Sequence, residues 1–298
     1  MRRRSIHPPF RIDLRRTLGP LRHGRNDPTA RFAADGFWRA TRTPAGTATL
    51  HVRAEGTVLE AEAWGDGADW ALDAAPALLG CDDDDAGFRP EHPLLRRIVH
   101  DLPGLRIGRS AAVLEAMVPA IIEQKVTGYE ARRAFVQLVR RFGEPAPGPA
   151  DLLVPPDPRV LASLHYYELH PLGIERKRAD TIRRASAHAT RLEAIVDLPG
   201  PDARQRLQAL PGVGPWTAAE TTIVALGDAD AVSVGDFHLP NQVAWALAGE
   251  PRGDDARMLQ LLEPYRGHRG RVARLIVAAG IQAPRRGPRH RSRSIAGI

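Results

Sequence analysis

A short glycine- and proline-rich segment, "PGVGP" at residues 211–215, interrupts a long helical pattern and constrains the fold more than any other feature. Glycine permits backbone angles that other residues avoid, and a proline suits the first turn of a helix, where no N–H is needed. The segment therefore predicts a tight hairpin between helices at 202–209 and 216–226. The N–H groups of Gly212 and Gly214 are predicted to face outward at a helix N-terminus, which favours anion binding. An ordinary helix–turn–helix corner explains the same pattern.

Periodicity divides the chain into a strand-rich part and a helix-rich part. Alternating apolar residues predict strands within 37–64, and helical spacing of apolar residues dominates the second part. We therefore predict an α+β protein, with a small antiparallel sheet domain at 31–91 followed by an all-helical domain at 92–283. Residues 1–30 are predicted as a basic N-terminal segment. Residues 284–298 are predicted as a disordered basic tail, because they contain many arginines and few apolar residues.

Composition narrows the class of protein further. The 298 residues contain no apolar run long enough to span a membrane and no recognisable secretory signal, so we expect a cytoplasmic chain without a membrane partner. The single cysteine, Cys81, excludes an internal disulfide framework, a cysteine-ligated zinc site and a four-cysteine iron–sulfur cluster.

The net charge of +7 is unevenly distributed along the chain. Residues 1–31 carry nine arginines against two aspartates, whereas residues 32–95 carry four arginines against twelve acidic residues. A DNA backbone would be repelled by the second of these segments. The acidic run Asp82–Asp85 within it is predicted to form a solvated loop that closes the sheet domain.

A second notable element, "VSVGDFHLPNQ", begins soon after the hairpin helices. Asp236 follows a glycine and precedes an apolar helix predicted at 239–248, where an aspartate commonly caps the helix. The combination of "LPGVGPWTA", the spacer and "VGDFHL" resembles the helix-hairpin-helix DNA glycosylases. Within that superfamily the chain is similar to the bacterial 3-methyladenine DNA glycosylase II family, also in "AIIEQKVTGYEARRA" and "LLEPYRGHRGRVARLIV". The resemblance covers roughly residues 30–282.

This resemblance implies a monomeric, monofunctional DNA glycosylase. Such an enzyme flips alkylated purines of the 3-methyladenine type out of double-stranded DNA and hydrolyses the N-glycosidic bond, leaving an abasic site in base excision repair. The resemblance assigns Asp236 to stabilising the cationic sugar and activating water, a role that a pre-placed carboxylate suits physically. Bifunctional relatives carry a lysine where this chain has Trp216, and neither of its two lysines is nearby in sequence. We therefore expect base excision without strand cleavage.

The resemblance also implies an aromatic base-binding site at Trp216 and Tyr265. Electron-rich rings attract a cationic base. Tyr265 departs from the tryptophan that is usual in the family, and Trp216 alternatively only packs the hairpin.

The family places an apolar wedge residue where this chain has Lys125. Lysine fills the gap left by a flipped nucleotide with its aliphatic stem, or it contacts only the DNA backbone. Gln124 beside it hydrogen-bonds base edges or caps the helix break at Gly128. The predicted DNA-binding residues are Gln124, Lys125, Gly212, Val213, Gly214 and Thr217.

No cofactor is expected to be required, but the resemblance implies a monovalent cation, Na⁺ or K⁺, at the hairpin. Its predicted ligands are the backbone carbonyls of Gln208, Leu210 and Val213.

Two other functions compete with this reading. A non-catalytic helix-hairpin-helix protein would use the hairpin only as a phosphate clamp, but it would need neither Asp236 nor an aromatic site. A glycosylase for another class of lesion is the second alternative. The absent hairpin lysine and absent cysteine cluster argue against the oxidised-base and mismatch-adenine branches.

Overall fold

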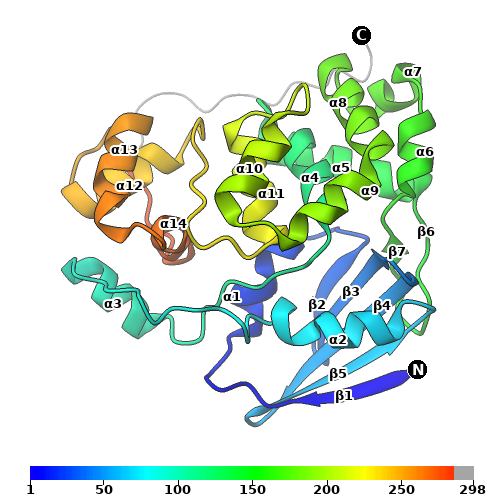
Figure 1. Cartoon of the computed structure of the whole chain (residues 1–298), viewed down its shortest axis with the longest axis horizontal. Coiled ribbons are helices and arrows are strands. Elements are labelled where there is room, and N and C mark those ends of the chain that lie inside the picture. The colour runs from blue at the N-terminus through cyan, green and yellow to red at the C-terminus, as the bar shows by residue number, and fades with distance from the viewer. Residues whose placement is uncertain (285–298) are drawn as a thin grey trace.

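The computed structural model describes residues 1–284. Its first part is a five-stranded antiparallel sheet in the order β1-β5-β4-β3-β2 (Figure 1). The strands are β1 (Arg2–Ile6), β2 (Ala30–Ala33), β3 (Gly36–Thr43), β4 (Gly46–Glu55) and β5 (Val58–Trp64). The predicted α+β class, with a sheet followed by helices, is confirmed. The predicted tail lies outside the described residues from 285 onward.

The rest of the structure is mostly helical. The helices are α1 (Leu14–Leu18), α2 (Ala68–Leu78), α3 (Pro93–Asp101), α4 (Val113–Ile122), α5 (Gly128–Phe142), α6 (Pro158–Ser163), α7 (Tyr166–Leu169), α8 (Arg176–Ala187), α9 (Ala189–Glu193), α10 (Gly200–Gln208), α11 (Pro215–Ala225), α12 (Leu239–Ala248), α13 (Asp255–Leu262) and α14 (Arg269–Ala278). A small second sheet pairs β6 (Glu144–Pro145) with β7 (Leu153–Val154). Within residues 1–284, no helix is long and apolar enough to cross a bilayer.

The five-stranded sheet is stabilised by helix α2, which packs across one of its faces. Alternate residues of β5 are buried, as expected for a sheet with one covered face. Leu50 and Val52 of β4 share a fully buried cluster with Leu72 and Ala75 of α2. Burial of this apolar surface holds the sheet domain together.

The N-terminal residues differ from their prediction as a separate segment, because β1 is an edge strand of this sheet. It pairs with β5 in antiparallel register. Its basic side chains form ion pairs with acidic residues of the sheet domain, namely Arg2 with Asp69, Arg3 with Glu62 and Arg4 with Asp73. The sequence "RRRSI" has no apolar alternation, so periodicity gave no signal for this strand.

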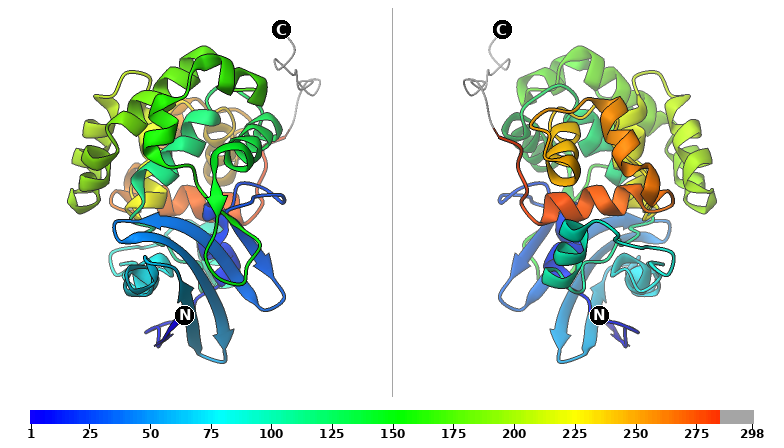
Figure 2. Two further views of the ribbon diagram at one scale, coloured as in Figure 1. Left: turned by 90° about the vertical axis from the view of Figure 1, so that its right-hand side faces the viewer. Right: turned by 90° about the vertical axis from the view of Figure 1, so that its left-hand side faces the viewer.

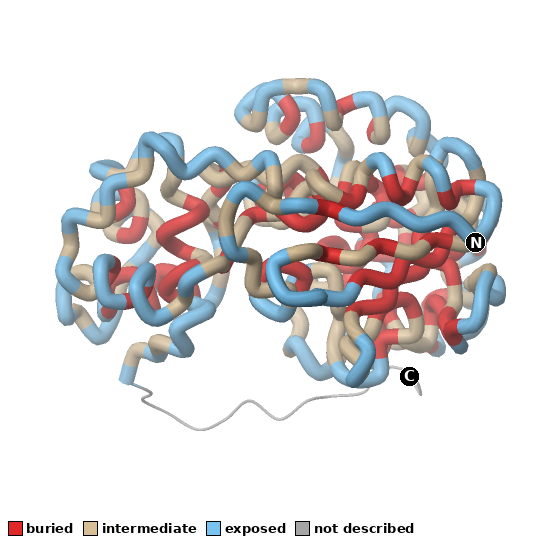
Figure 3. Tube along the Cα trace, turned by 90° about the horizontal axis from the view of Figure 1, so that it is seen from below, coloured by how far each residue is buried: buried red, intermediate tan, exposed pale blue. Residues whose placement is uncertain are grey.

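The helical part contains two buried clusters. One is built by α4, α5, α8 and α11, and the other by α3, α12, α13 and α14. Two further views show the helices stacked above the sheet, with α14 close to it (Figure 2). Burial along the chain is concentrated inside these layers, while the outer turns are exposed (Figure 3). Helix α4 is buried at almost every position, so it is the central element of the larger cluster.

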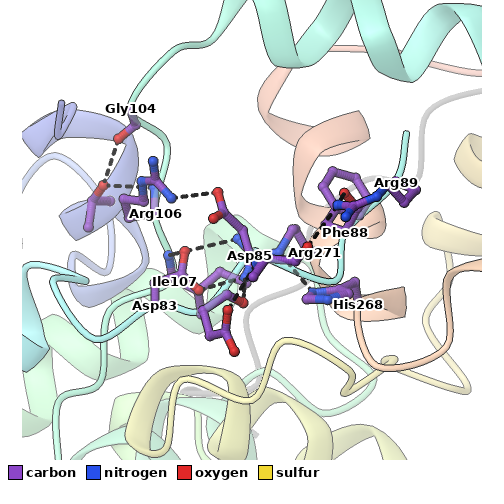
Figure 4. A network of polar contacts seen from close by, with 12 residues as sticks. Asp83, Asp85, Phe88, Arg89, Gly104, Arg106, Ile107, His268 and Arg271 are labelled. Atoms are coloured by element: carbon purple, nitrogen blue, oxygen red, sulfur yellow. Dashed lines mark hydrogen bonds and ion pairs between the residues drawn. The ribbon is translucent and has the colours of Figure 1, made fainter. Parts of the chain in front are cut away.

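The acidic run lies in a loop in which Asp82, Asp84 and Asp85 are exposed, as predicted, but Asp83 is only 3% exposed in its side chain. Its carboxylate accepts hydrogen bonds from Arg271 of α14 at 2.6 and 2.9 Å, and from the Ile107 N–H at 3.0 Å (Figure 4). Asp85 also pairs with Arg106 at 2.6 Å. The acidic run therefore connects the sheet domain to the C-terminal helices.

We predict that Asp83→Ala lowers the free energy of unfolding by about 3–5 kcal/mol, because it leaves the Arg271 charge buried without its partner. Asp82→Ala is the matched control. Asp82 is exposed, and its loss should change stability by no more than about 0.5 kcal/mol. Urea unfolding of both variants measures the difference. Equal stability of the two would show that the buried pair does not hold the domains together.

Candidate active site

The predicted hairpin joins α10 to α11, and one of its glycines is sterically required. Gly212 has φ +97°, and a Cβ atom there would lie 2.1 Å from Thr181 Oγ1. Gly214 has an ordinary extended backbone with φ −98°, and no atom lies within 4 Å of a Cβ built on it. Gly212 therefore permits close packing on α8, whereas Gly214 leaves the N-terminus of α11 open.

The backbone N–H groups of the hairpin are partly free. The Val213 N–H donates to the Leu210 carbonyl at 3.0 Å. The N–H groups of Gly212 and Gly214 have no acceptor among residues 1–284. Two donors therefore remain available to an anion at the start of α11.

Gln124, at the end of α4, binds the hairpin rather than an open base pair or the break at Gly128. Its Nε2 donates to the Gly212 carbonyl at 3.0 Å and to Thr217 Oγ1 at 2.8 Å. The Thr217 side chain is only 2% exposed, so the geometry does not support its predicted contact with DNA. The break at Gly128 is instead capped by Thr127 and Glu130.

Asp236 and Trp216 lie side by side, although they are twenty residues apart in sequence. Trp216 Nε1 donates to Asp236 Oδ2 at 3.0 Å. Asp236 Oδ1 accepts from the backbone N–H groups of His238 at 2.7 Å and Leu239 at 2.8 Å. The carboxylate therefore caps the start of α12 and also faces the hairpin tryptophan. Three N–H groups fix its orientation.

The loop that carries Asp236 is held to α11 at a second point. Glu220 lies one turn after Trp216 on α11, so both face the same side of the helix. Ser233 donates its hydroxyl proton to Glu220 in a short hydrogen bond. Burial raises the pKa of Glu220, and the charge of Asp236 raises it further, against the opposing Ser233 hydrogen bond. The sequence analysis missed Glu220, although the four-residue spacing from Trp216 was a signal for it.

A further carboxyl group at this site, Glu123, was also missed. It directly precedes Gln124 at the end of α4. Burial and the negative charge of Glu220 raise its pKa to about 7; Asp236 adds to the shift and Arg132 opposes it. Three carboxyl groups thus lie within electrostatic range of one another beside Trp216. This arrangement favours a cationic or proton-accepting ligand.

The other two predicted side chains are those of Lys125 and Tyr265. Lys125 is exposed, and its φ of 55° is left-handed, a strained conformation for a residue other than glycine. Tyr265 is half-buried among the C-terminal helices, with its ring centroid 6.4 Å from that of Phe88. Within the described part of the chain, Tyr265 makes no recorded ring contact or hydrogen bond with Trp216. The exposed ring beside the carboxylate is that of Phe237, which is 78% exposed.

The carbonyl groups proposed for a cation differ in their bonding. The Leu210 carbonyl accepts the Val213 N–H, whereas the Gln208 and Val213 carbonyls accept no hydrogen bond within residues 1–284. Carbonyls without donors at a helix end are suitable ligands for a monovalent cation. The Gln208 and Val213 carbonyls therefore fit the predicted role, whereas the Leu210 carbonyl already accepts a hydrogen bond.

No protein-family profile matches the chain. The chain is 33% identical over 150 residues to the probable bifunctional transcriptional activator/DNA repair enzyme AlkA of Mycobacterium tuberculosis (strain ATCC 25618 / H37Rv), covering 49% of this chain and 30% of that protein. It is 30% identical over 131 residues to the thymine-DNA glycosylase of Aeropyrum pernix, covering 43% and 50%. The match therefore spans at most half the length of these relatives.

The fold is similar to that of the 3-methyladenine DNA-glycosylase from Archaeoglobus fulgidus, with a TM-score of 0.79 and 16% identity. That similarity covers 92% of this chain and 97% of the other. The sequence matches and the fold together show that the chain is similar to DNA glycosylases over the part of its length that these matches cover. Its relatives include proteins of the AlkA type.

We predict that Glu123 makes stability depend on pH. Its pKa rises from 4.5 to about 7 on folding, so the folded protein loses stability as the pH rises between these values. Glu123→Gln should therefore be more stable than the wild type at pH 8 by about 1–3 kcal/mol, and nearly equal to it at pH 4. Urea unfolding at both pH values measures this. Glu91→Gln, at an exposed position, is the control and should show no such dependence on pH. A difference in the free energy of unfolding between Glu123→Gln and wild type that is the same at both pH values would contradict the linkage.

Proposed function

We propose that this protein is a monofunctional DNA glycosylase that excises alkylated purines of the 3-methyladenine type from double-stranded DNA. The observation that carries this proposal is the 3.0 Å hydrogen bond between Trp216 Nε1 and Asp236 Oδ2. It sets an aromatic ring and a carboxylate together beside a hairpin with free N–H groups. A protein that only binds DNA has no need of this pairing. We further propose that the enzyme acts as a monomer in the cytoplasm.

In this mechanism the hairpin holds the DNA backbone. The free N–H groups of Gly212 and Gly214 bind a phosphate oxygen at the positive end of α11. Arg184, whose Nη1 donates to the Pro211 carbonyl at 2.7 Å, adds positive charge beside the turn. A monovalent cation bound by Gln208 and Val213 carbonyls would supply further positive charge for a phosphate. These contacts position the strand without reading its sequence.

The damaged nucleotide then leaves the duplex, at a cost of about a few kcal/mol. The ring of Trp216 stacks against the extruded base, and a cationic N-alkylpurine gains about 0.5–2 kcal/mol from such a contact. The negative charge of the Asp236 carboxylate attracts the same cation. The Asp236 hydrogen bond fixes the Trp216 ring in one orientation.

Asp236 acts on the sugar. As the bond between C1′ and the base nitrogen breaks, its electron pair leaves with the base and positive charge develops on the deoxyribose. The Asp236 carboxylate stabilises that charge and orients water for addition to C1′. The proton released by the water passes to the carboxylate or to solvent. The products are a free base and an abasic site.

The absence of strand cleavage rests on Trp216, which occupies the hairpin position where bifunctional relatives carry lysine. Lys125 is distant in sequence, but its neighbour Gln124 contacts the hairpin, so sequence separation alone does not remove it from the site. A glycosylase for another lesion class is the second candidate. The relationship to the Aeropyrum pernix thymine-DNA glycosylase favours it.

We predict that Asp236→Asn lowers base release by at least about 100-fold while leaving DNA affinity nearly unchanged, because the charge on the sugar loses its counterion. Free bases from methylated duplex DNA are measured by chromatography, and binding by fluorescence anisotropy. Asp254→Asn is the matched control, since Asp254 caps α13 through the Arg257 N–H and has no hydrogen bond to Trp216 or Asp236 among residues 1–284. Full activity of Asp236→Asn would remove this carboxylate from the mechanism.

Lys125→Ala should lower single-turnover base release by about tenfold and affinity for undamaged DNA by no more than about twofold, because the gap left by the flipped base is no longer filled. Lys177 is the other lysine of the chain and is exposed. Lys177→Ala should change base release and affinity for undamaged DNA to the same extent. An equal drop in both for Lys125→Ala would make it a phosphate contact only.

Borohydride trapping of wild type on abasic DNA should give no covalent adduct. An adduct that is lost in Lys125→Ala would make the enzyme bifunctional.

A further inference from the structure

We infer that Glu123 is a general acid that protonates the departing base, which extends the substrates of this site from cationic alkylated purines to neutral damaged purines. The inference rests on the proposed glycosylase function. The site then has two catalytic carboxyl groups: Asp236 stabilises positive charge on the sugar, and Glu123 donates a proton to the base.

The three carboxyl groups of the site differ in their bonding. Asp236 accepts three N–H groups, and Glu220 accepts the Ser233 hydroxyl. The Glu123 carboxyl group has no hydrogen-bond or ion-pair partner among residues 1–284, and its oxygens are not sealed from solvent. It is therefore the carboxyl group of the three that remains free to bind a ligand.

The backbone that carries Glu123 is nevertheless held firmly on both sides. The Ile122 carbonyl accepts a hydrogen bond from Arg178 Nη1 at 2.7 Å. On the other side, Gln124 donates to Gly212 and Thr217 of the hairpin. A residue with a fixed backbone and an unpartnered acid group is suited to a reaction that requires defined placement.

The charges around Glu123 favour its protonated form. Glu220 of α11 and Asp236 before α12 raise the pKa of Glu123, while Arg132 of α5 lowers it. Lys125 follows on the same segment but is exposed. Burial and these acidic groups raise the pKa of Glu123 to about 7, so a sizeable fraction carries a proton at neutral pH. An acid of this strength is well matched to proton transfer near pH 7.

The chemical need for such an acid depends on the charge of the base. A cationic N-alkylpurine leaves as a neutral molecule and requires no proton. A neutral purine would leave as an anion, unless a proton from the Glu123 carboxyl group reaches a ring nitrogen as the C1′–N9 bond breaks and its electron pair moves to the ring. Water then adds to C1′, and its proton returns to the Glu123 carboxylate directly or through solvent. The sum is hydrolysis, with no further reactant.

The experiment compares two duplexes under single-turnover conditions, one with 2′-deoxyinosine and one with 7-methyl-2′-deoxyguanosine, between pH 6 and 8.5. Wild-type release of hypoxanthine should fall as the pH rises through about 7, because the acid form is lost. Glu123→Gln should release hypoxanthine about a hundredfold more slowly with no such pH dependence, and 7-methylguanine less than about fivefold more slowly. Glu91→Gln, at an exposed position, should match wild type on both.

Three outcomes would overturn the inference. Equal loss of both activities in Glu123→Gln would assign Glu123 a structural role. Release of 7-methylguanine by the wild type without release of hypoxanthine, or hypoxanthine release that Glu123→Gln leaves intact, would refute the acid role while the proposed function stands. Release of neither base by the wild type would refute the proposed function as well.

Discussion

The candidate site depends on the contact between the end of α4 and the glycine hairpin, made by the Gln124 side chain. One amide nitrogen satisfies both the Gly212 carbonyl and the buried Thr217 hydroxyl. Each such bond contributes about 1 kcal/mol net, but loss of the donor would leave a buried hydroxyl without a partner, which costs more. The same contact brings the segment with Glu123 and Lys125 beside the helix that begins with Trp216. Together with the packing of α4 on α11, it brings residues nearly a hundred positions apart into one site.

The net charge of the chain does not show how its charged side chains pair with one another. The arginines of β1 pair with acids of the sheet domain, and Asp83 pairs with Arg271 inside the protein. Each of these charges thus has a partner within the protein. Arg184 is a positive group beside the hairpin, where it donates to the Pro211 carbonyl.

The helices and the hairpin could be predicted from the sequence because their signals are local. The sequence located α10, α11 and α12, and the glycine–proline pattern located the turn between α10 and α11. Features that depend on distant partners could not be found in this way. β1 has only one buried residue, and Asp83 belongs to a run that reads as solvated until Arg271 is known to face it.

The same limit applies to the site itself. Asp236 and Trp216 were recognised through motifs, but their direct hydrogen bond was not foreseen. Glu123 and Glu220 read in the sequence as ordinary helix carboxylates, and only packing of α4 on α11 buries them together. The hydrogen bond between Gln124 and Thr217 could not be predicted for a related reason, since it joins two segments that are far apart in sequence.

Two carboxyl groups in one site can perform different chemistry when their surroundings differ. The Asp236 carboxylate accepts three N–H donors, which hold it in one orientation. Burial raises the pKa of Glu123, and its two acidic neighbours raise it further, so that it retains a proton more readily. The two residues also differ in position: Asp236 precedes a helix, where backbone N–H groups are free, and Glu123 follows a helix, where they are not. In the mechanism that we propose, the helix ends that build the hairpin fold thus also separate a stabilising anion from an acid.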